Sequence, residues 1–405
     1  MPEVSRQGTP RSRCTNAPIC ERPIMIGETA QPPHIAFFGH NPGDAAVKRR
    51  MSAFCRAGFE VTGVMPHRGP LEPPDWPHID LGETRDNDYA GRLKLIRRSA
   101  RLLAPHIDRL RSADVIYARN LDMLMLAYRL RRQLRLGGAL VYECLDIHHR
   151  LTGDGMAARL LRGIERRLLR ECALVVVSSP RFESEHFARY FPGLAPVALL
   201  ENRLVEGDAF GPRPDPAQRP GDGPLRIGWF GNLRCRRSFD VLSALAARCD
   251  GRVQIVLRGY PARSVFPEFE AEVSAAPHME WHGRYAAPLD LSWIYADVDL
   301  VWAADWYEEG ANSLWLLPNR IYEGGYFATP AIAVRGTETA RWLVDRSAGF
   351  VIDEPVSASL ERLISRLLKD PAEIVEARQT LLGLPRETFV ESPEIMRALI
   401  DRVAR

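Results

Sequence analysis

The sequence has little that would mark a membrane or secreted protein. It contains no run of about 18 apolar residues, the length that a membrane-spanning helix needs, so no transmembrane helix is expected. Residues 1–33 are rich in Pro, Arg, Thr and Cys and lack the continuous apolar region of a signal peptide. We expect these residues to form a disordered leader. The sequence leaves open a start at Met25.

Metal-binding and disulfide patterns are also missing. The chain has seven cysteines, but none form a CxxC pair and none have histidines at a zinc-ligand spacing. This argues against a zinc site or a disulfide framework and favours the reducing cytoplasm. The cysteines are Cys14, Cys20, Cys55, Cys144, Cys172, Cys235 and Cys249.

The chain as a whole has little excess charge of either sign, but one segment is strongly basic. The net charge is +3, whereas residues 92–170 hold 18 Lys and Arg against 7 Asp and Glu. Nothing in the chain resembles a nucleic-acid-binding module, so no nucleic-acid partner is expected. Two interpretations of the basic segment stay open: solvated helix faces, or contact with an anionic membrane surface.

What the sequence does contain is an alternation of apolar strands and amphipathic helices. At 405 residues, 46% of them hydrophobic, the chain is long enough for two globular domains. Helical spacing is clearest over residues 156–172, where Leu160, Leu161, Ile164 and Leu168 form an apolar stripe. Strands that alternate with helices indicate parallel βαβ units and an α/β fold. The expected strands of the first half lie within residues 35–38, 59–66, 113–120, 138–149 and 172–180.

A segment rich in Pro and Gly, residues 207–224, predicts a linker between a domain over residues 34–206 and one over residues 225–386. Each domain is expected to be doubly wound and Rossmann-like, with the ligand in the cleft between them, near the carboxyl ends of strands. An amphipathic helix at about 387–405 could cross back onto the first domain. The expected strands of the second half lie within residues 225–233, 252–261, 278–285, 298–306, 329–336 and 348–355.

A basic loop follows the first strand of the second half. Gly231 would let a ligand approach the backbone, and Arg234 and Arg237 come at the entry to a helix. Helix N-termini attract anions, and guanidinium groups suit phosphate oxygens. The pattern therefore predicts a phosphate site, and the alternative is an ordinary basic surface loop.

A second candidate lies in "LLPNRIYEGGYFATPAIAV", residues 316–334. Arg320 and Glu323 stand three apart between apolar flanks, which places both on one face of a helical turn. The alternative is a surface ion pair that contributes only tenths of a kcal/mol. The buried character of the flanks favours a binding role, in which the carboxylate accepts from a ribose diol and the Arg meets a diphosphate.

These two segments together resemble the retaining GT-B glycosyltransferases of the family 4 type. That family has a Glu, seven residues, a second Glu and then a turn of a small residue and Pro. Glu323 matches the second Glu and Thr329-Pro330 the turn, whereas Trp315 stands where the first Glu is expected. The resemblance thus implies donor binding by Glu323 and leaves the contact to the transferred sugar without its usual residue.

Other positions of the pattern also vary. Asn232 stands where the family has a basic residue, and Arg237 matches its later Lys. Glu308, Glu309 or Asn312 are candidate replacements for the missing Glu, and no spacing argument selects one.

A narrower resemblance covers most of residues 34–352. The segments "GHNPGDAAVKRRMSAFCRAGFEV", "DVIYARNLDMLMLA", "LVYECLDIHH" and "LLENRL" are similar to succinoglycan-type exopolysaccharide glycosyltransferases. The resemblance implies that a residue of "ECLDIHHRL" contacts the reacting sugar, and we choose Asp146 and His148 as catalytic candidates. The alternative is a structural His with an Asp that caps the next helix.

The early loop "GHNPGD" corresponds in the resemblance to a Gly-rich turn next to the acceptor. His40, Asn41 and Asp44 are the candidate acceptor-binding residues, and Asn202 in "LLENRL" is interpreted as structural.

The resemblance implies transfer of a hexose from a nucleotide-diphosphate sugar, with uridine the commonest base, to a saccharide acceptor that is polyprenyl-linked. The expected location is the cytoplasm, peripheral on the inner membrane face. No metal or other cofactor is expected, because the Asp297-Val-Asp299 motif falls inside an apolar strand. Two alternatives stay open: a non-catalytic nucleotide-sugar-binding subunit, and a sugar-nucleotide epimerase.

Overall fold

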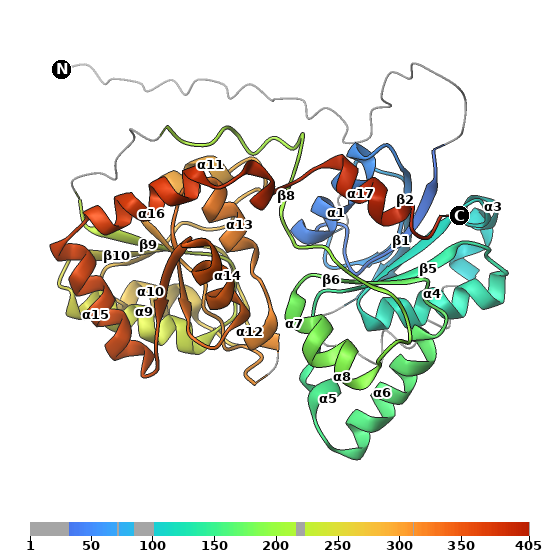
Figure 1. The fold of residues 1–405 in the computed structure, drawn as a ribbon, viewed down its shortest axis with the longest axis horizontal. Coiled ribbons are helices and arrows are strands. Elements are labelled where there is room, and N and C mark those ends of the chain that lie inside the picture. Colours follow the sequence, from blue (N-terminus) through green and yellow to red (C-terminus); the bar gives the residue numbers. More distant parts are fainter. Residues whose placement is uncertain (1–31, 71–72, 85–100, 216–222, 311, 405) are drawn as a thin grey trace, which may run out of the picture.

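Two parallel sheets, each flanked by helices, form two lobes that lie side by side (Figure 1). The computed structural model describes residues 32–70, 73–84, 101–215, 223–310 and 312–404. The expected leader over residues 1–33 lies almost entirely outside the described residues. The sheets span His34–Leu199 and Leu225–Ile352, and these lobes are called the N-terminal and C-terminal domains below.

The N-terminal sheet has seven strands in the order β3-β2-β1-β4-β5-β6-β7. Its strands are β1 (His34–Phe38), β2 (Glu60–His67), β3 (His78–Glu83), β4 (Val115–Arg119), β5 (Ala139–Cys144), β6 (Leu174–Val177) and β7 (Val197–Leu199). Its helices are α1 (Ala45–Arg56), a 3₁₀ turn (Ala104–His106), α3 (Ile107–Arg111), α4 (Leu121–Leu134), α5 (His149–Thr152), α6 (Met156–Leu169), α7 (Pro180–Phe182), a π-helical turn (Glu183–Phe187) and α8 (Ala188–Tyr190).

The C-terminal sheet has six strands in the order β11-β10-β9-β12-β13-β14. They are β9 (Leu225–Leu233), β10 (Val253–Pro261), β11 (Met279–Trp281), β12 (Leu300–Trp302), β13 (Ala331–Val334) and β14 (Gly349–Ile352). The helices are α9 (Arg236–Arg248), α10 (Phe269–Ala275), α11 (Leu291–Ala296), α12 (Asn312–Trp315), α13 (Asn319–Tyr326), α14 (Glu338–Arg346), α15 (Val356–Lys369) and α16 (Ala372–Gly383).

The strand sequences form strands because both faces of each sheet are buried. In β1, Ala36 and Phe38 belong to one apolar cluster and Ile35 and Phe37 to another, as the two-residue period of a strand requires. Parallel sheets covered on both faces produce such continuous apolar runs. Every run expected from the sequence contains a strand, and the predicted α/β fold with two doubly wound sheets is confirmed. The short edge strands β3 and β7 were not expected.

The chain crosses back to the N-terminal domain at its end. A short 3₁₀ turn (Arg386–Thr388) leads to β15 (Val390–Glu391), which pairs in parallel with β8 (Leu204–Val205). Then α17 (Pro393–Ile400), red in Figure 1, lies beside α1. The Arg397 guanidinium donates to the Ala57 carbonyl at 3.0 Å. The chain therefore passes between the domains twice, once before β9 and once after α16.

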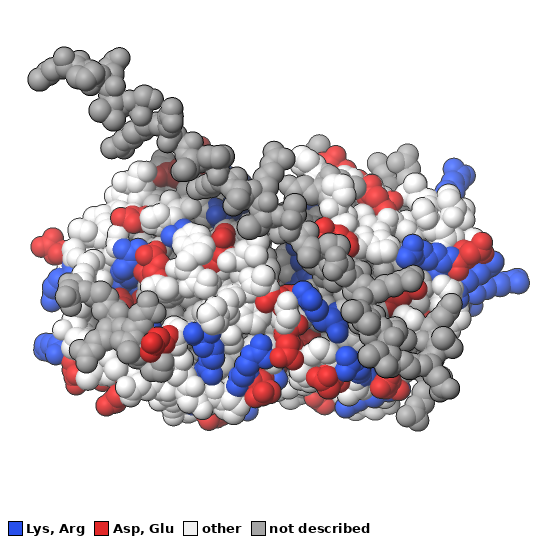
Figure 2. Space-filling model, turned by 90° about the horizontal axis from the view of Figure 1, so that it is seen from above, with Lys and Arg blue, Asp and Glu red and all other residues white. Residues whose placement is uncertain are grey.

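The basic helix α6 differs from its prediction. Leu168 is buried and Leu161 and Ile164 pack on the core, but Leu160 is 69% exposed and does not belong to a buried stripe. Seen from above, basic and acidic side chains are interspersed, and basic ones gather at the N-terminal-domain end on the right (Figure 2). Among the described residues, none of the helices combines the length and the apolar character that a membrane span requires.

Candidate functional site

Each sheet has one point where the strand order reverses. In the N-terminal domain it lies between β1 and β4, and in the C-terminal domain between β9 and β12. Ligands of doubly wound sheets bind outside the carboxyl ends of the strands at such points. The segments that follow these strands are therefore where a site is expected.

At the C-terminal reversal, the loops after β9 and β12 enclose a pocket of about 410 Å³ whose lining includes Arg234 and Arg237. Arg234 lies over the Tyr307 ring at 4.7 Å, and Arg237 over the Trp306 ring at 4.4 Å. The Cys235 thiol caps α9 by accepting from the Ser238 amide and also accepts from the Trp306 amide. The two loops are thus fastened together.

Carboxylates surround these two arginines. Arg234 pairs with Asp305 at 3.6 Å, and Arg237 with Glu354 at 2.7 Å and Glu309 at 3.7 Å. Both guanidiniums are partly exposed, and the first turn of α9 holds no acidic residue. The dipole of α9 and the two guanidiniums favour anions here, while Asp305, Glu354 and Glu309 balance the arginine charges within the same domain.

Glu323 lies at the gap between the domains. Its side chain, on α13, is 4% exposed, and both oxygens have partners. Oε1 accepts from Nη2 of Arg49, on α1 of the other domain, at 2.5 Å, and Oε2 accepts from the Tyr295 hydroxyl at 2.9 Å. The Glu323 carboxylate is therefore held from both domains.

Arg320 and Gly231 lie close to the Tyr285 hydroxyl, which also interacts with Glu323. Among the described residues, Nη1 of Arg320 is buried without a hydrogen-bond partner. Burial raises the pKa of the Tyr285 hydroxyl, Glu323 raises it further, and Arg49 and Arg320 oppose this. Gly231 has φ +101°, and a Cβ there would lie 3.9 Å from the Tyr285 hydroxyl.

The predicted donor-binding residues therefore fall into two groups. Gly231, Arg320 and Glu323 gather around Tyr285, whereas Arg234 and Arg237 line the pocket after β9 and β12. Within the described ranges, no hydrogen bond or ion pair joins Arg237 to Arg320 or Glu323.

The predicted acceptor-binding residues follow β1, at the N-terminal reversal. The Nε2 atom of His40 lies 2.8 Å from Asp122, in the first turn of α4, the helix that follows β4. Asp44 caps α1 and accepts from the Ala46 amide at 2.8 Å, while the Asn41 amide oxygen accepts from the Gly43 amide at 3.3 Å. Asp44 thus has a local structural role, while His40 faces the reversal point.

The catalytic candidates lie after β5 and meet the C-terminal domain. Nδ2 of Asn312 donates to Asp146 at 2.9 Å, and Oδ1 of Asn312 accepts from the Ile147 amide at 3.3 Å. His148 is the N-cap of α5, and its Nδ1 accepts from the Arg150 amide at 3.2 Å. The capping role weighed for an Asp in the sequence is therefore taken by His148.

Glu143, which begins the "ECLDIHHRL" segment, lies in the core of the N-terminal domain. Its side chain is 1% exposed and accepts from Arg119 at 2.7 Å and from Arg50 at 2.9 Å. Burial alone would raise the pKa of this carboxyl, but the two arginines outweigh burial and lower it. Arg50 also pairs with Glu391 of β15 at 3.2 Å, which ties the chain end to this domain.

Trp315, at the position of the missing Glu, has a role that the sequence did not reveal. Trp315 and Leu316 pack on the apolar core of the N-terminal domain. The Ser179 hydroxyl donates to the Trp315 carbonyl, and Arg181 donates to the Leu314 carbonyl at 3.3 Å. Helix α12 therefore docks on α7 across the gap (Figure 1).

Arg49, Tyr295 and Asp122 were also missed. Asp122 follows a strand end, so the rule that polar residues there face the site was sufficient to find it. No sequence signal separates Arg49 from its neighbour Arg50, because both stand on the same helix.

The prediction that Asp297 and Asp299 lie inside a strand is wrong. Both precede β12, where Asp297 pairs with Arg226 at 3.0 Å and Asp299 accepts from the Arg226 amide at 2.8 Å. In the part of the chain that the structure describes, no group of three or more His, Cys, Asp or Glu is placed to hold a metal.

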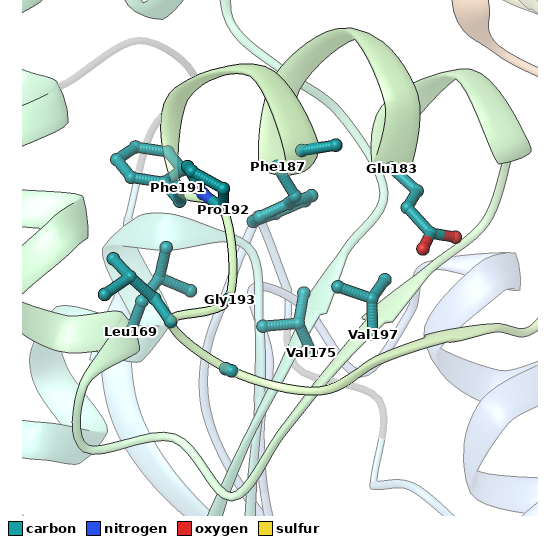
Figure 3. Close-up of a pocket in the computed structure, with 11 residues that line it drawn as sticks. Leu169, Val175, Glu183, Phe187, Phe191, Pro192, Gly193 and Val197 are labelled. Carbon is teal, nitrogen blue, oxygen red and sulfur yellow. The ribbon is translucent and has the colours of Figure 1, made fainter.

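A further hollow of about 310 Å³ lies elsewhere in the N-terminal domain (Figure 3). Val175 and Val197, at the amino ends of β6 and β7, form part of its lining, and Phe187 and Phe191 cover it. Since the candidate site lies at the carboxyl ends of strands, this hollow is separate from it.

The fold is that of the GT-B glycosyltransferases. Sucrose-phosphate synthase from Thermosynechococcus elongatus superposes with a TM-score of 0.70 at 16% identity, covering 91% of this chain and 98% of that chain. Anabaena HepE, solved with UDP and glucose, superposes with a TM-score of 0.68 at 16% identity and the same coverage. The predicted GT-B fold is confirmed.

The sequence places the chain more narrowly. It is 41% identical over 343 residues, 82% of this chain and 84% of its relative, to the succinoglycan biosynthesis protein ExoL of Rhizobium meliloti (strain 1021). The chain belongs to the ExoL family, which confirms the predicted succinoglycan-type resemblance. No protein-family model matches the chain.

Proposed function

We propose that the protein is a glycosyltransferase of exopolysaccharide biosynthesis that transfers a sugar from a UDP-sugar to a saccharide acceptor. Family membership with a succinoglycan biosynthesis protein supports the pathway, and the GT-B fold supports the reaction. HepE, which shares the fold, was solved with UDP-glucose, and this supports a uridine donor.

The observation that carries the proposal is the grouping of cations around one carboxylate on the C-terminal side of the gap. Glu323 accepts from the ribose diol, while Arg320 and the first turn of α13 meet the diphosphate. Arg234 and Arg237 add positive charge at the neighbouring strand ends. Stabilising the departing diphosphate lowers the barrier directly, because negative charge develops there as the glycosidic bond breaks.

The proposal is metal-independent, since guanidinium groups supply the positive charge that the diphosphate needs. Asp146 and His148 stand at the carboxyl end of β5, next to Asn312 of the other domain. We assign them to the reacting sugar, and His40 and Asn41 to hydroxyl groups of the acceptor. Retention of configuration is proposed from the family 4 resemblance.

The acceptor is proposed to be polyprenyl-linked, with the protein peripheral on the inner face of the cytoplasmic membrane. On α6, Met156 is 83% and Leu160 69% exposed, and Arg159 stands beside Leu160 in the sequence. Apolar side chains among arginines suit the surface of an anionic bilayer. Residues 92–100 of the basic segment lie outside the described residues. Failure to float with anionic vesicles at low salt removes this part of the proposal.

The experiment that tests the function has two stages. Calorimetry with a panel of nucleotides identifies the base, and incubation with the matching nucleotide sugars then measures release of nucleoside diphosphate. Sustained release, slow without acceptor and faster with extracted lipid-linked saccharide, is the expected result.

One observation favours a second candidate, a non-catalytic nucleotide-sugar-binding subunit. Trp315 replaces the Glu that touches the transferred sugar in the resembling family and is engaged in domain docking. Binding of a nucleotide sugar without any turnover would favour this candidate, and conversion of the donor alone would indicate an epimerase.

A further inference from the structure

Arg49 is a cation of the N-terminal domain that reaches the C-terminal domain. Its Nη1 donates to the Asn202 carbonyl at 3.0 Å, in the segment that connects the domains, and its Nη2 donates to Glu323 at 2.5 Å. The side chains of Arg49 and Glu323 are 12% and 4% exposed. A largely buried ion pair therefore spans the gap at the carboxylate that is proposed to bind ribose.

A ribose diol reaches Glu323 only if one of the two present partners withdraws, because the carboxylate is almost fully covered. Tyr295 cannot withdraw easily: it is fully buried, its ring stacks on Phe327 at 5.9 Å, and it meets the Phe230 ring edge-on at 5.2 Å. Arg49 has a long side chain on the opposite domain. Arg49 is therefore the partner that withdraws from Glu323 when the ribose binds.

The released guanidinium needs a new anion. A buried charge left without its partner is strongly destabilising, and Arg320 adds a second cation close by. Asp208 is another carboxylate close enough for the charge of Arg49 to lower its pKa. Asp208 already accepts from Ser52 at 2.5 Å and pairs with Arg56 at 3.9 Å. A diphosphate beside Arg320 supplies the missing negative charge.

We propose that Arg49 is a donor-binding residue contributed by the N-terminal domain, paired with Glu323 in the free protein and with the diphosphate of the nucleotide sugar in the complex. This inference rests on the proposed function, in which Glu323 binds the ribose. When the donor binds, Arg49 exchanges its contact with Glu323 of the C-terminal domain for a contact with the donor diphosphate.

The test compares UDP with uridine, which differ in the diphosphate alone. In the full-length chain, Arg49→Gln removes the cation, and Arg56→Gln is the matched control, since Arg56 stands on the same helix and pairs with the interdomain segment. By calorimetry, Arg49→Gln is expected to weaken UDP binding by about tenfold or more, the scale of a charge-assisted hydrogen bond. Uridine binding stays equal or tightens, because a competitor for Glu323 is gone. Arg56→Gln should change neither by more than about twofold.

Four results would overturn the inference. Equal weakening of UDP and uridine means that Arg49 holds the domains in place and nothing more. Tighter uridine binding with unchanged UDP binding means that Arg49 competes for Glu323 without meeting the diphosphate. If Arg49→Gln does not fold, Arg49→Met, which keeps an apolar stem and removes the charge, is tested in its place, and an unchanged preference for UDP over uridine contradicts the inference. A wild-type protein that binds neither ligand overturns the uridine-donor assignment itself, and this inference with it.

Discussion

Both strand-order reversals face the gap between the domains, but the charged side chains at the two points differ in their partners and exposure. At the N-terminal one, His40 pairs with Asp122 and Asp44 caps α1, so the polar groups are matched within their own domain. At the C-terminal one, Arg234 and Arg237 also pair with carboxylates of their own domain but stay partly exposed, and among the described residues the buried Nη1 of Arg320 has no hydrogen-bond partner. The first edge suits neutral hydroxyl groups and the second suits an anion. We therefore propose that the N-terminal edge binds the acceptor and the C-terminal edge binds the donor.

The substitution with the largest expected effect on this comparison is at Glu323. Glu323→Ala is expected to weaken UDP binding by about a hundredfold or more, because it removes the carboxylate that is proposed to accept from two ribose hydroxyls. Calorimetry with UDP measures this loss. The near-ultraviolet circular dichroism spectrum checks that the fold survives.

Tyr295→Phe is the matched control, since it removes the other hydrogen bond to the same carboxylate and leaves the charge in place. It should weaken UDP binding far less. If Glu323→Ala instead unfolds the protein while UDP binding persists in the remaining soluble fraction, Glu323 is structural and the donor side of the comparison collapses.

A smaller effect is expected at Arg237. Arg237→Ala removes a cation from the pocket that follows β9 and β12, and UDP affinity should fall about tenfold while uridine affinity stays the same. Stability should change little, because its ion pairs with Glu354 and Glu309 are exposed. Arg263→Ala, which breaks a comparable exposed pair with Glu270, is the control. Unaltered UDP binding would place the diphosphate outside this pocket.

The contrast also explains what the sequence could and could not predict. Strands such as β9 were predicted because continuous apolar runs depend on local sequence alone, and their alternation with helices determines the doubly wound fold. The cationic loop could be found because Arg234 and Arg237 follow a strand directly.

Contacts between distant segments were beyond the sequence. The Arg49–Glu323 pair joins residues 274 positions apart, and the Arg50–Glu143 pair joins residues 93 apart. Trp315 appeared to be a lost catalytic position because its packing partners belong to the other domain. The sequence shows which groups are charged, whereas the fold decides which charges are cancelled.

The acceptor side is tested by Asp44→Ala. The Asp44 carboxylate accepts from two amides of the first turn of α1, so its loss should reduce the free energy of unfolding by about 1 kcal/mol. UDP affinity should be unchanged, because this cap belongs to the other edge. Chemical denaturation and calorimetry measure the two quantities, and Asp44→Asn, which restores a cap, should recover most of the stability. Loss of UDP affinity in Asp44→Ala would mean that the start of α1 takes part in donor binding, either directly or by positioning Arg49.

The smallest effect concerns histidine. Burial lowers the pKa of His34, whose ring nitrogens lie 3.0 Å from the Ser112 hydroxyl and 2.9 Å from the Thr62 hydroxyl. The unfolded chain, with a histidine pKa near 6.5, then binds the proton more tightly than the folded chain, so stability is lost as pH falls through 6.5. Denaturation at pH 7.5 and 5.5 should show lower stability at the acid value and a smaller difference in His34→Gln. Equal stability of the wild type at both pH values would contradict a neutral, buried His34.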